Sequence, residues 1–232
     1  DPLNISTGNP GLKPSWNNSL DAEYNNYIRS TQTSYSVRVN YSNTRNSISN
    51  AVIYDEQTGV RTSQPENING NWNAGFNGTF NTSFSDESPF NFSSNTSYNF
   101  SNHVGFVSLN RQTSQKNTVR NTDIGERLRA SYRKGLFEFG IYGNINYQHS
   151  RSELQKQANL DTYNFSYGGN LQYTTEFGLG ITSDIGMNSR RGYSDANMNT
   201  NELIWNATIQ QNFRQLLRGH NLTLRVQGYD LV

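Results

Sequence analysis

Three histidines, His103, His149 and His220, are the side chains of this sequence best suited to acid–base chemistry near neutral pH. Catalysis would require an acidic partner within hydrogen-bond reach of one of them. His149 falls on the apolar side of an alternating segment, His220 follows a tight turn, and His103 stands alone. We therefore expect no catalytic residue, no cofactor and no metal, and a protein that is not an enzyme.

Two other patterns would suit different chemistry. The run from Asp195 to Glu202 begins like a calcium-binding loop, but it lacks the turn glycine and its final acid comes too early. Asn91, Asn95 and Asn99 each begin an Asn-x-Ser/Thr triplet, the acceptor pattern for N-glycosylation. Such triplets would indicate a glycosylated surface protein only if they lay in exposed loops.

The stretch that holds these triplets alternates between two kinds of residue. Its even positions are Phe90, Phe92, Ser94, Thr96, Tyr98 and Phe100, and every odd position is Asn or Ser. A period of two predicts a β-strand with one aromatic face and one polar face. The pleat alone then produces Asn-x-Ser/Thr. The same alternation recurs in residues 71–84, 137–148, 178–187 and 203–210.

Tight and long connections alternate between the predicted strands. The tight ones are Arg29–Ser34, Ser85–Pro89, Arg133–Leu136, Thr174–Glu176 and Arg214–Gly219; the long ones are Asn46–Gly70, His103–Thr122, Ser150–Leu160 and Ser189–Thr200. This rhythm predicts about ten strands of roughly ten to fourteen residues, longer than the five or six that are typical of soluble sheets. Long alternating strands, short turns on one side and longer loops on the other are typical of a transmembrane β-barrel. The predicted fold class is therefore all-β, an antiparallel transmembrane β-barrel, and the alternative is a soluble β-sandwich.

Aromatic residues recur near both ends of the predicted strands, as in the girdles at the two membrane interfaces. Trp72 and Phe84 would lie roughly 28 Å apart along the membrane normal, and Phe137 and Tyr147 roughly 23 Å apart, for strands tilted near 45°. The apolar band of such barrels is about 25 Å tall. The predicted girdle comprises Trp72, Phe84, Phe90, Phe137, Tyr147, Tyr173, Phe177, Trp205 and Phe213.

Charged residues fall mainly on the polar parity. They would line a lumen, as structural ion pairs, contacts with a plug, or guides for a solute; the predicted set is Glu23, Arg38, Arg127, Arg129, Glu138, Asp184 and Arg225. Glu126 is an exception, because its parity points to lipid. We expect it near the rim or beside a bulge.

The composition excludes several classes of protein. The 232 residues include no cysteine, so a disulfide framework and cysteine metal sites are excluded. The net charge of +1 gives no basis for binding nucleic acid. Hydrophobic residues make up only 32%, but aromatics reach 12%, which is unlike a disordered chain.

Short motifs resemble one family. GNPGLKP, at Gly8–Pro14, resembles the segment that leads into a late barrel strand of TonB-dependent outer-membrane receptors, and the final YDLV resembles the segment before their last strand. The resemblance implies a 22-stranded barrel of which residues 1–232 form a single segment, incomplete at both ends and without a plug domain. It also implies the outer membrane of a Gram-negative bacterium, with tight turns facing the periplasm.

The expected function follows from this resemblance. The chain would form barrel wall and extracellular loops of a TonB-dependent transporter for a large solute, and the alternative is a passive, structural or adhesive barrel without energy coupling. The expected partners are outer-membrane lipid, the remaining strands and plug of the same receptor, the TonB complex through that plug, and a surface lipoprotein; nucleic acid is not expected.

Overall fold

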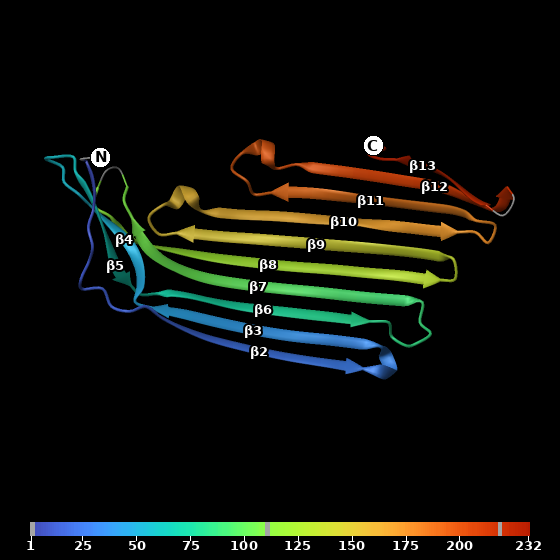
Figure 1. The fold of residues 1–232 in the computed structure, drawn as a ribbon, viewed down its shortest axis with the longest axis horizontal. Coiled ribbons are helices and arrows are strands. Elements are labelled where there is room, and N and C mark those ends of the chain that lie inside the picture. The colour runs from blue at the N-terminus through green and yellow to red at the C-terminus, as the bar shows by residue number, and fades with distance from the viewer. Residues whose placement is uncertain (1–2, 110–111, 218–219) are drawn as a thin grey trace.

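One sheet of ten antiparallel strands forms most of the molecule (Figure 1). The computed structural model describes residues 3–109, 112–217 and 220–232. Strands that follow one another in sequence also pair in the sheet, except that two short strands intervene between β3 and β6. The ten strands are β2 (Trp16–Ile28), β3 (Thr33–Arg45), β6 (Asn71–Thr82), β7 (Phe90–Val107), β8 (Gln115–Lys134), β9 (Phe137–Ser152), β10 (Leu160–Thr174), β11 (Leu179–Arg191), β12 (Asn201–Leu217) and β13 (His220–Gly228).

The predicted number and pairing of strands are confirmed, but several strands are longer than expected. β7 has 18 residues and β8 has 20, because both strands extend into the segment that was predicted to form the loop between them. The pairs His103 with Val119 and Val107 with Gln115 are regular ladder positions. The prediction of a loop from His103 to Thr122 is therefore wrong, and the connection between the two strands spans only residues 108–114.

The connections define two ends of the sheet. The tight connections at residues 29–32, 83–89, 135–136 and 175–178 lie at what we call the inner end. The connections at residues 46–70, 108–114, 153–159 and 192–200 lie at what we call the outer end (Figure 1). Those at 46–70 and 192–200 are long, whereas those at 108–114 and 153–159 are as long as the one at 83–89. The turn predicted at Arg214–Gly219 falls partly outside the described residues.

The long connection at residues 46–70 is not an irregular loop. It contains β4 (Ser47–Tyr54) and β5 (Arg61–Ile68), which pair antiparallel, and β1 (Asn4–Ser6) adds a parallel strand to β5. This three-stranded sheet packs against the outer part of β7, where the amide of Phe106 donates to Ser49 Oγ at 3.3 Å. Among the described residues, the buried apolar side chains are Ala51 in β4, Ile68 in β5 and Val104 in the outer part of β7.

The main sheet has two chemically different faces, as the alternation predicts. Phe76, for example, pairs with Val39 on one side and Tyr98 on the other, so the three side chains share a face. The next residue, Asn77, pairs with Arg38 and Ser97 on the opposite face. We call these the apolar face and the polar face.

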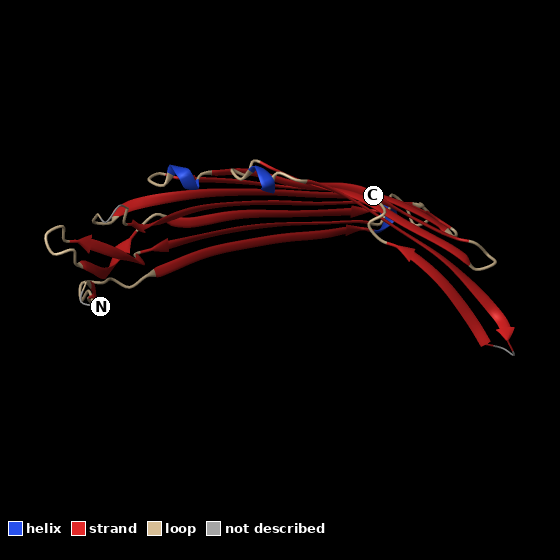
Figure 2. Cartoon of the chain, turned by 90° about the horizontal axis from the view of Figure 1, so that it is seen from above, coloured by secondary structure: helices blue, strands red, loops and turns tan. Residues whose placement is uncertain are grey.

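The sheet forms one curved layer, and within the part of the chain that the structure describes no second layer packs against its length (Figure 2). Large apolar side chains consequently remain exposed along the apolar face; Ile141 is 52% exposed and Ile209 is 53% exposed. A soluble sandwich would cover such side chains with a second sheet. The sandwich alternative is therefore wrong. Within the described residues, no helix has the length and apolar character needed to cross a membrane.

Candidate functional site

The seven charges predicted to share a face do share it. Glu23 pairs with Arg38, and the line of paired residues continues through Asn77, Ser97 and Gly125 along the polar face. The other predicted residues, Arg127, Arg129, Glu138, Asp184 and Arg225, occupy the same parity in β8, β9, β11 and β13. Their function as lumen charges stays a prediction.

Most of these charges are held by a neighbour on an adjacent strand. Arg38 forms an ion pair with Asp21 at 3.0 Å. Asn206 donates to Asp184 at 2.9 Å, and Arg225 donates to Gln210 at 3.0 Å. Glu138 pairs with Arg133, Glu23 accepts from Asn25, and within the described residues Arg127 and Arg129 form no ion pair. These contacts fix most of the charged side chains along the polar face.

Glycines on the polar face make room for larger side chains of neighbouring strands. Tyr142 in β9 lies across Gly168 and Gly186, and a Cβ placed on Gly186 would come within 2.5 Å of the Tyr142 hydroxyl. Asn40 lies over Gly75 in the same way. At these positions the larger side chains lie flat along the polar face and do not project away from it.

A polar cavity of about 370 Å³ opens on this face near the outer end. Its polar lining comes from four strands and one loop: Asn144, Asn164, Ser166, Asn188, Ser189, Arg190, Tyr193 and Glu202. Amides and hydroxyls can both donate and accept hydrogen bonds, and Arg190 and Glu202 add one charge of each sign. This site, which we call the outer polar cavity, can bind a polar solute through hydrogen bonds.

The loop at residues 192–200 folds over the cavity. The Tyr193 hydroxyl donates to Asn164 Oδ1 at 3.1 Å, and the Tyr193 backbone is held by Asn199. Gly192 has a φ of +83° and lies against the backbone of Asp161, so a side chain there would collide. The sequence analysis missed this site. Parity placed Asn144, Asn164 and Ser166 on the polar face, but their convergence depends on register.

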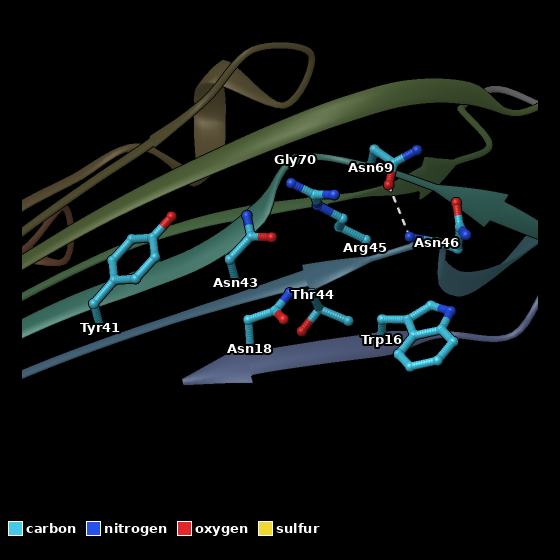
Figure 3. A pocket seen from close by; sticks show the side chains of 9 residues that line it. All are labelled: Trp16, Asn18, Tyr41, Asn43, Thr44, Arg45, Asn46, Asn69 and Gly70. Carbon is cyan, nitrogen blue, oxygen red and sulfur yellow. Dashed lines mark hydrogen bonds between the residues drawn. The ribbon is translucent and has the colours of Figure 1, made fainter. Parts of the chain in front are cut away.

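A larger cavity, about 970 Å³, lies at the outer ends of β2 and β3 (Figure 3). Trp16 and Asn18 border it from β2, and Tyr41 and Asn43 from β3. The backbone N–H of Asn46 donates to Asn69 Oδ1 at 2.7 Å, and both residues line the cavity (Figure 3). β2 is an edge strand, so the wall of this cavity depends on whatever pairs with β2. We therefore do not assign it a function.

Seven of the nine predicted girdle residues lie in strands on the apolar face. Phe90 and Phe137 lie at the inner end, where Tyr132 contacts both rings at centroid distances of 4.9 Å and 6.2 Å. Tyr147 lies toward the outer end and stacks on Tyr163 at 4.6 Å. The remaining strand positions are Trp72, Tyr173, Trp205 and Phe213.

Phe84 and Phe177 are corrections to the predicted girdle. β6 ends at Thr82, and Phe84 has a φ of 66°, a left-handed conformation that interrupts the alternation. Phe177 lies in the turn between β10 and β11 and is 69% exposed. The predicted separation between Trp72 and Phe84 therefore does not apply. Phe100, Tyr132 and Tyr163 join the aromatic rows instead.

The aromatic rows also measure how far the strands tilt. Phe90 pairs with Tyr132, and this line continues through Phe139, Leu171 and Ser183 to Ala207. The inner aromatic of β12 is Phe213, six residues beyond Ala207 (213 − 207 = 6), after five strand-to-strand steps. At about 3.3 Å per residue and 4.8 Å between strands, this shift corresponds to a tilt of about 40°. Strands of membrane barrels tilt by about 35–45°.

Glu126 lies on the apolar face, as its parity predicts. Its register with Thr96 and Ile145 is regular, so the expected bulge is absent at this position. Ser94 Oγ donates to one carboxylate oxygen at 2.8 Å and Thr96 Oγ1 to the other at 2.5 Å. These two hydroxyls replace water as partners, which reduces the cost of a carboxylate on this face.

His149 has an acidic partner that sequence reasoning missed. At the outer end of the apolar face, His149 Nδ1 lies 2.6 Å from Asp161 Oδ1, and the Tyr147 hydroxyl donates to the same oxygen at 3.0 Å. Arg151 pairs with the other oxygen of Asp161. Hydrogen bonds from Arg151 and, to a smaller extent, from His149 lower the pKa of Asp161 to about 2. Asp161 lies beyond the aromatic row and stays ionised.

His103 does not extend this cluster. His103 lies on the polar face, paired in register with Val119. The side chain of His220 lies outside the described residues. Among the residues that the structure describes, no group of three or more His, Cys, Asp or Glu side chains could hold a metal ion. In the calcium-like segment, Asp195 instead accepts from the Asn197 amide at 2.9 Å.

Comparison with known proteins identifies the family. Residues 1–123 match the model of the outer membrane protein beta-barrel family. Since this match covers more than half of the 232 residues, the chain belongs to that family. The chain is accordingly a β-barrel protein of the Gram-negative outer membrane. In barrels of this kind an apolar outer face meets lipid, and rows of aromatic residues lie at its two borders. For the apolar face and the aromatic rows of this chain, these roles stay predictions.

A solved structure shows a weaker likeness. CdiB from Acinetobacter baumannii is 14% identical with a TM-score of 0.30, and the match covers 94% of this chain and 39% of that one. This chain therefore spans much less than the full length of that protein. A TM-score of this size does not establish a shared geometry, so the family match carries the assignment. No curated protein matches the sequence.

Proposed function

We propose that the chain forms part of the barrel wall and the extracellular loops of a TonB-dependent receptor that imports a large solute. The observation that carries the proposal is the polar face, a continuous lining of amides, hydroxyls and fixed charges with a cavity near its outer end. In a barrel, this face encloses the lumen. A solute that enters from outside would meet the outer polar cavity first.

The two edges of the sheet support a larger wall. Within the described residues, β2 and β13 each pair with one strand only. An unpaired strand edge in lipid costs several kcal/mol for each unsatisfied backbone group. We infer that further strands complete the barrel, in agreement with the motifs that resemble TonB-dependent receptors.

In this proposal the chain binds and guides a solute and performs no catalysis. A plug inside the completed barrel would gate the lumen, and the TonB complex would act on that plug. A surface lipoprotein would contact the outer-end loops. Lipid is the partner of the apolar face, and no nucleic acid is involved.

The test uses the full-length protein in its own outer membrane. Its intact mass and sequence would be determined, and photo-crosslinking would identify whether the TonB complex contacts it. The proposal expects a plug domain ahead of the barrel and a specific crosslink to TonB. A full-length protein with neither would be a passive, structural or adhesive barrel, and the transport proposal would be wrong.

The outer polar cavity has a separate test. Asn188→Leu removes one amide from the cavity, while Asn95→Leu removes an amide from the same face outside it. Uptake of the receptor's solute should weaken at least about fivefold for Asn188→Leu, the value of roughly one hydrogen bond. Equal uptake by the two variants would remove the cavity from the proposal.

A further inference from the structure

Arginines form a row on the apolar face just outside the aromatic residues of the outer end. Arg120 lies two residues beyond Thr122, the register partner of Phe100. Arg151 lies four residues beyond Tyr147 along β9, and Arg191 is the last residue of β11. These side chains share the parity that faces lipid, where a cationic side chain destabilises a barrel unless it lies near the interface or has a partner.

Strand tilt puts the three arginines at a common height. In the strand register, Arg120 of β8 is opposite Arg151 of β9. Arg191 of β11 is opposite Tyr163 of β10, and following the register across β9 from Tyr163 leads to Ile124 of β8. Arg191 therefore lies four residues inward of Arg120 (124 − 120 = 4) after three strand-to-strand steps.

The aromatic rows give the shift that tilt requires. The inner row shifts by six residues in five steps. For the outer row, the register is followed to β10 from Phe100 of β7 and from Trp205 of β12. It reaches Asp161 from Phe100 and Gly169 from Trp205, a shift of eight residues (169 − 161 = 8) over the same five steps. The mean is about 1.4 residues per step, or about four residues in three steps. Arg120 and Arg191 consequently lie level, parallel to the membrane surface.

The row carries positive charge in excess. Arg120 pairs with Glu153 at 3.2 Å and Arg151 with Asp161, so two carboxylates face three guanidiniums. Within the described residues, Arg191 hydrogen-bonds only neutral acceptors: the carbonyls of Arg190 and Thr200 and Oδ1 of Asn201. These bonds hold its guanidinium in place without neutralising it. A guanidinium has five N–H donors, so each of the three retains donors for an anion.

We infer that the surface around Arg120, Arg151 and Arg191 binds the phosphate groups of a phosphorylated glycolipid in the outer leaflet. Guanidinium groups pair with phosphate through two parallel hydrogen bonds, which gives strength and direction. The acyl chains of the same lipid would lie along the apolar face below, against Tyr147 and Tyr163. This inference depends on the membrane placement of the sheet and is independent of the proposed transport function.

The test measures lipid bound to the full-length protein. The protein is reconstituted into phosphatidylcholine nanodiscs that contain either diphosphorylated lipid A or its dephosphorylated form, and native mass spectrometry counts the bound glycolipid. A triple variant replaces Arg120, Arg151 and Arg191 with Gln. The control removes the same charge elsewhere, by replacing Arg29, Arg61 and Lys134 with Gln.

The inference expects wild-type and control proteins to retain diphosphorylated lipid A at least about tenfold more than the triple variant. All three should retain the dephosphorylated form equally, and millimolar inorganic phosphate should not displace the lipid. Equal retention of both lipids by the wild-type protein would overturn the inference, whether or not the variant folds. Displacement by inorganic phosphate would show a site for the free anion and would also overturn it.

Discussion

Replacing Ile141 with Arg should reveal which face of the sheet meets lipid. Ile141 lies in β9, four residues from Phe137 and six from Tyr147, and it is 52% exposed. At about 3.3 Å per residue and the tilt of about 40° derived above, it lies about 10 Å from the inner aromatic level and about 15 Å from the outer one. The guanidinium would therefore enter the middle of the apolar span.

The expected cost follows from that depth. Arginine near the midplane of the lipid-facing surface destabilises membrane barrels by about 2–4 kcal/mol, and by about 0–1 kcal/mol near the interfaces. An exposed position on a water-soluble sheet would change stability by only about 0.5 kcal/mol. The two environments thus predict results that differ several-fold.

The assay is reversible urea unfolding of the full-length protein in phospholipid vesicles, followed by tryptophan fluorescence. The matched control is Asn146→Arg, five residues along the same strand but on the polar face, paired with Gly125 and Asn164. We expect it to lose less than about 1 kcal/mol, because water reaches this face. If Ile141→Arg is tolerated as well as Asn146→Arg, the assignment of the apolar face to lipid is wrong.

Two further substitutions test the packing of the polar face by the same unfolding measurement. Gly186→Ala should lower the free energy of unfolding by about 1–2 kcal/mol, because its new methyl group meets the Tyr142 hydroxyl. The control Gly143→Ala should leave it unchanged, because a Cβ there has nothing within 4 Å. Equal effects of the two substitutions would contradict the proposed Tyr142 contact. Thr162→Val should leave stability unchanged or raise it by about 1 kcal/mol, because the buried Thr162 hydroxyl has no hydrogen-bond partner among the described residues. Thr33→Val should instead lose about 1 kcal/mol, since the Thr33 hydroxyl bonds that of Thr82 at 2.8 Å; a loss for both would show that Thr162 has a partner.

Alternation in the sequence was sufficient to predict the strands and their two faces. A pleated strand has a fixed period of two, so residues such as Phe76 and Asn77 reveal their faces without any tertiary information. The same argument failed at Phe84, where a positive φ ends the alternation. Phenylalanine is not a residue type that favours positive φ, so the sequence contained no signal for this change. It also failed at residues 46–70, where the chain uses the same alternation to build a separate small sheet.

The sites depended on register, which parity does not give. Parity placed His149 on the apolar side, but only the pairing of β9 with β10 brings it opposite Asp161. The outer polar cavity likewise requires Asn144, Asn164 and Asn188 to align across three strands. Register depends on turn geometry and on the packing of whole strands. Single-sequence patterns therefore predicted the faces and missed the clusters on them.

The most direct test of the two-faced membrane wall is the accessibility of single cysteines along β9. The chain contains no native cysteine, so each introduced thiol reports one position. Cysteines would replace residues 141–146 one at a time in the full-length protein in outer-membrane vesicles, followed by spin labelling. We predict that labels at even positions collide with a water-soluble relaxation agent and labels at odd positions with oxygen dissolved in lipid. Equal access of the water-soluble agent to both sets would contradict the account.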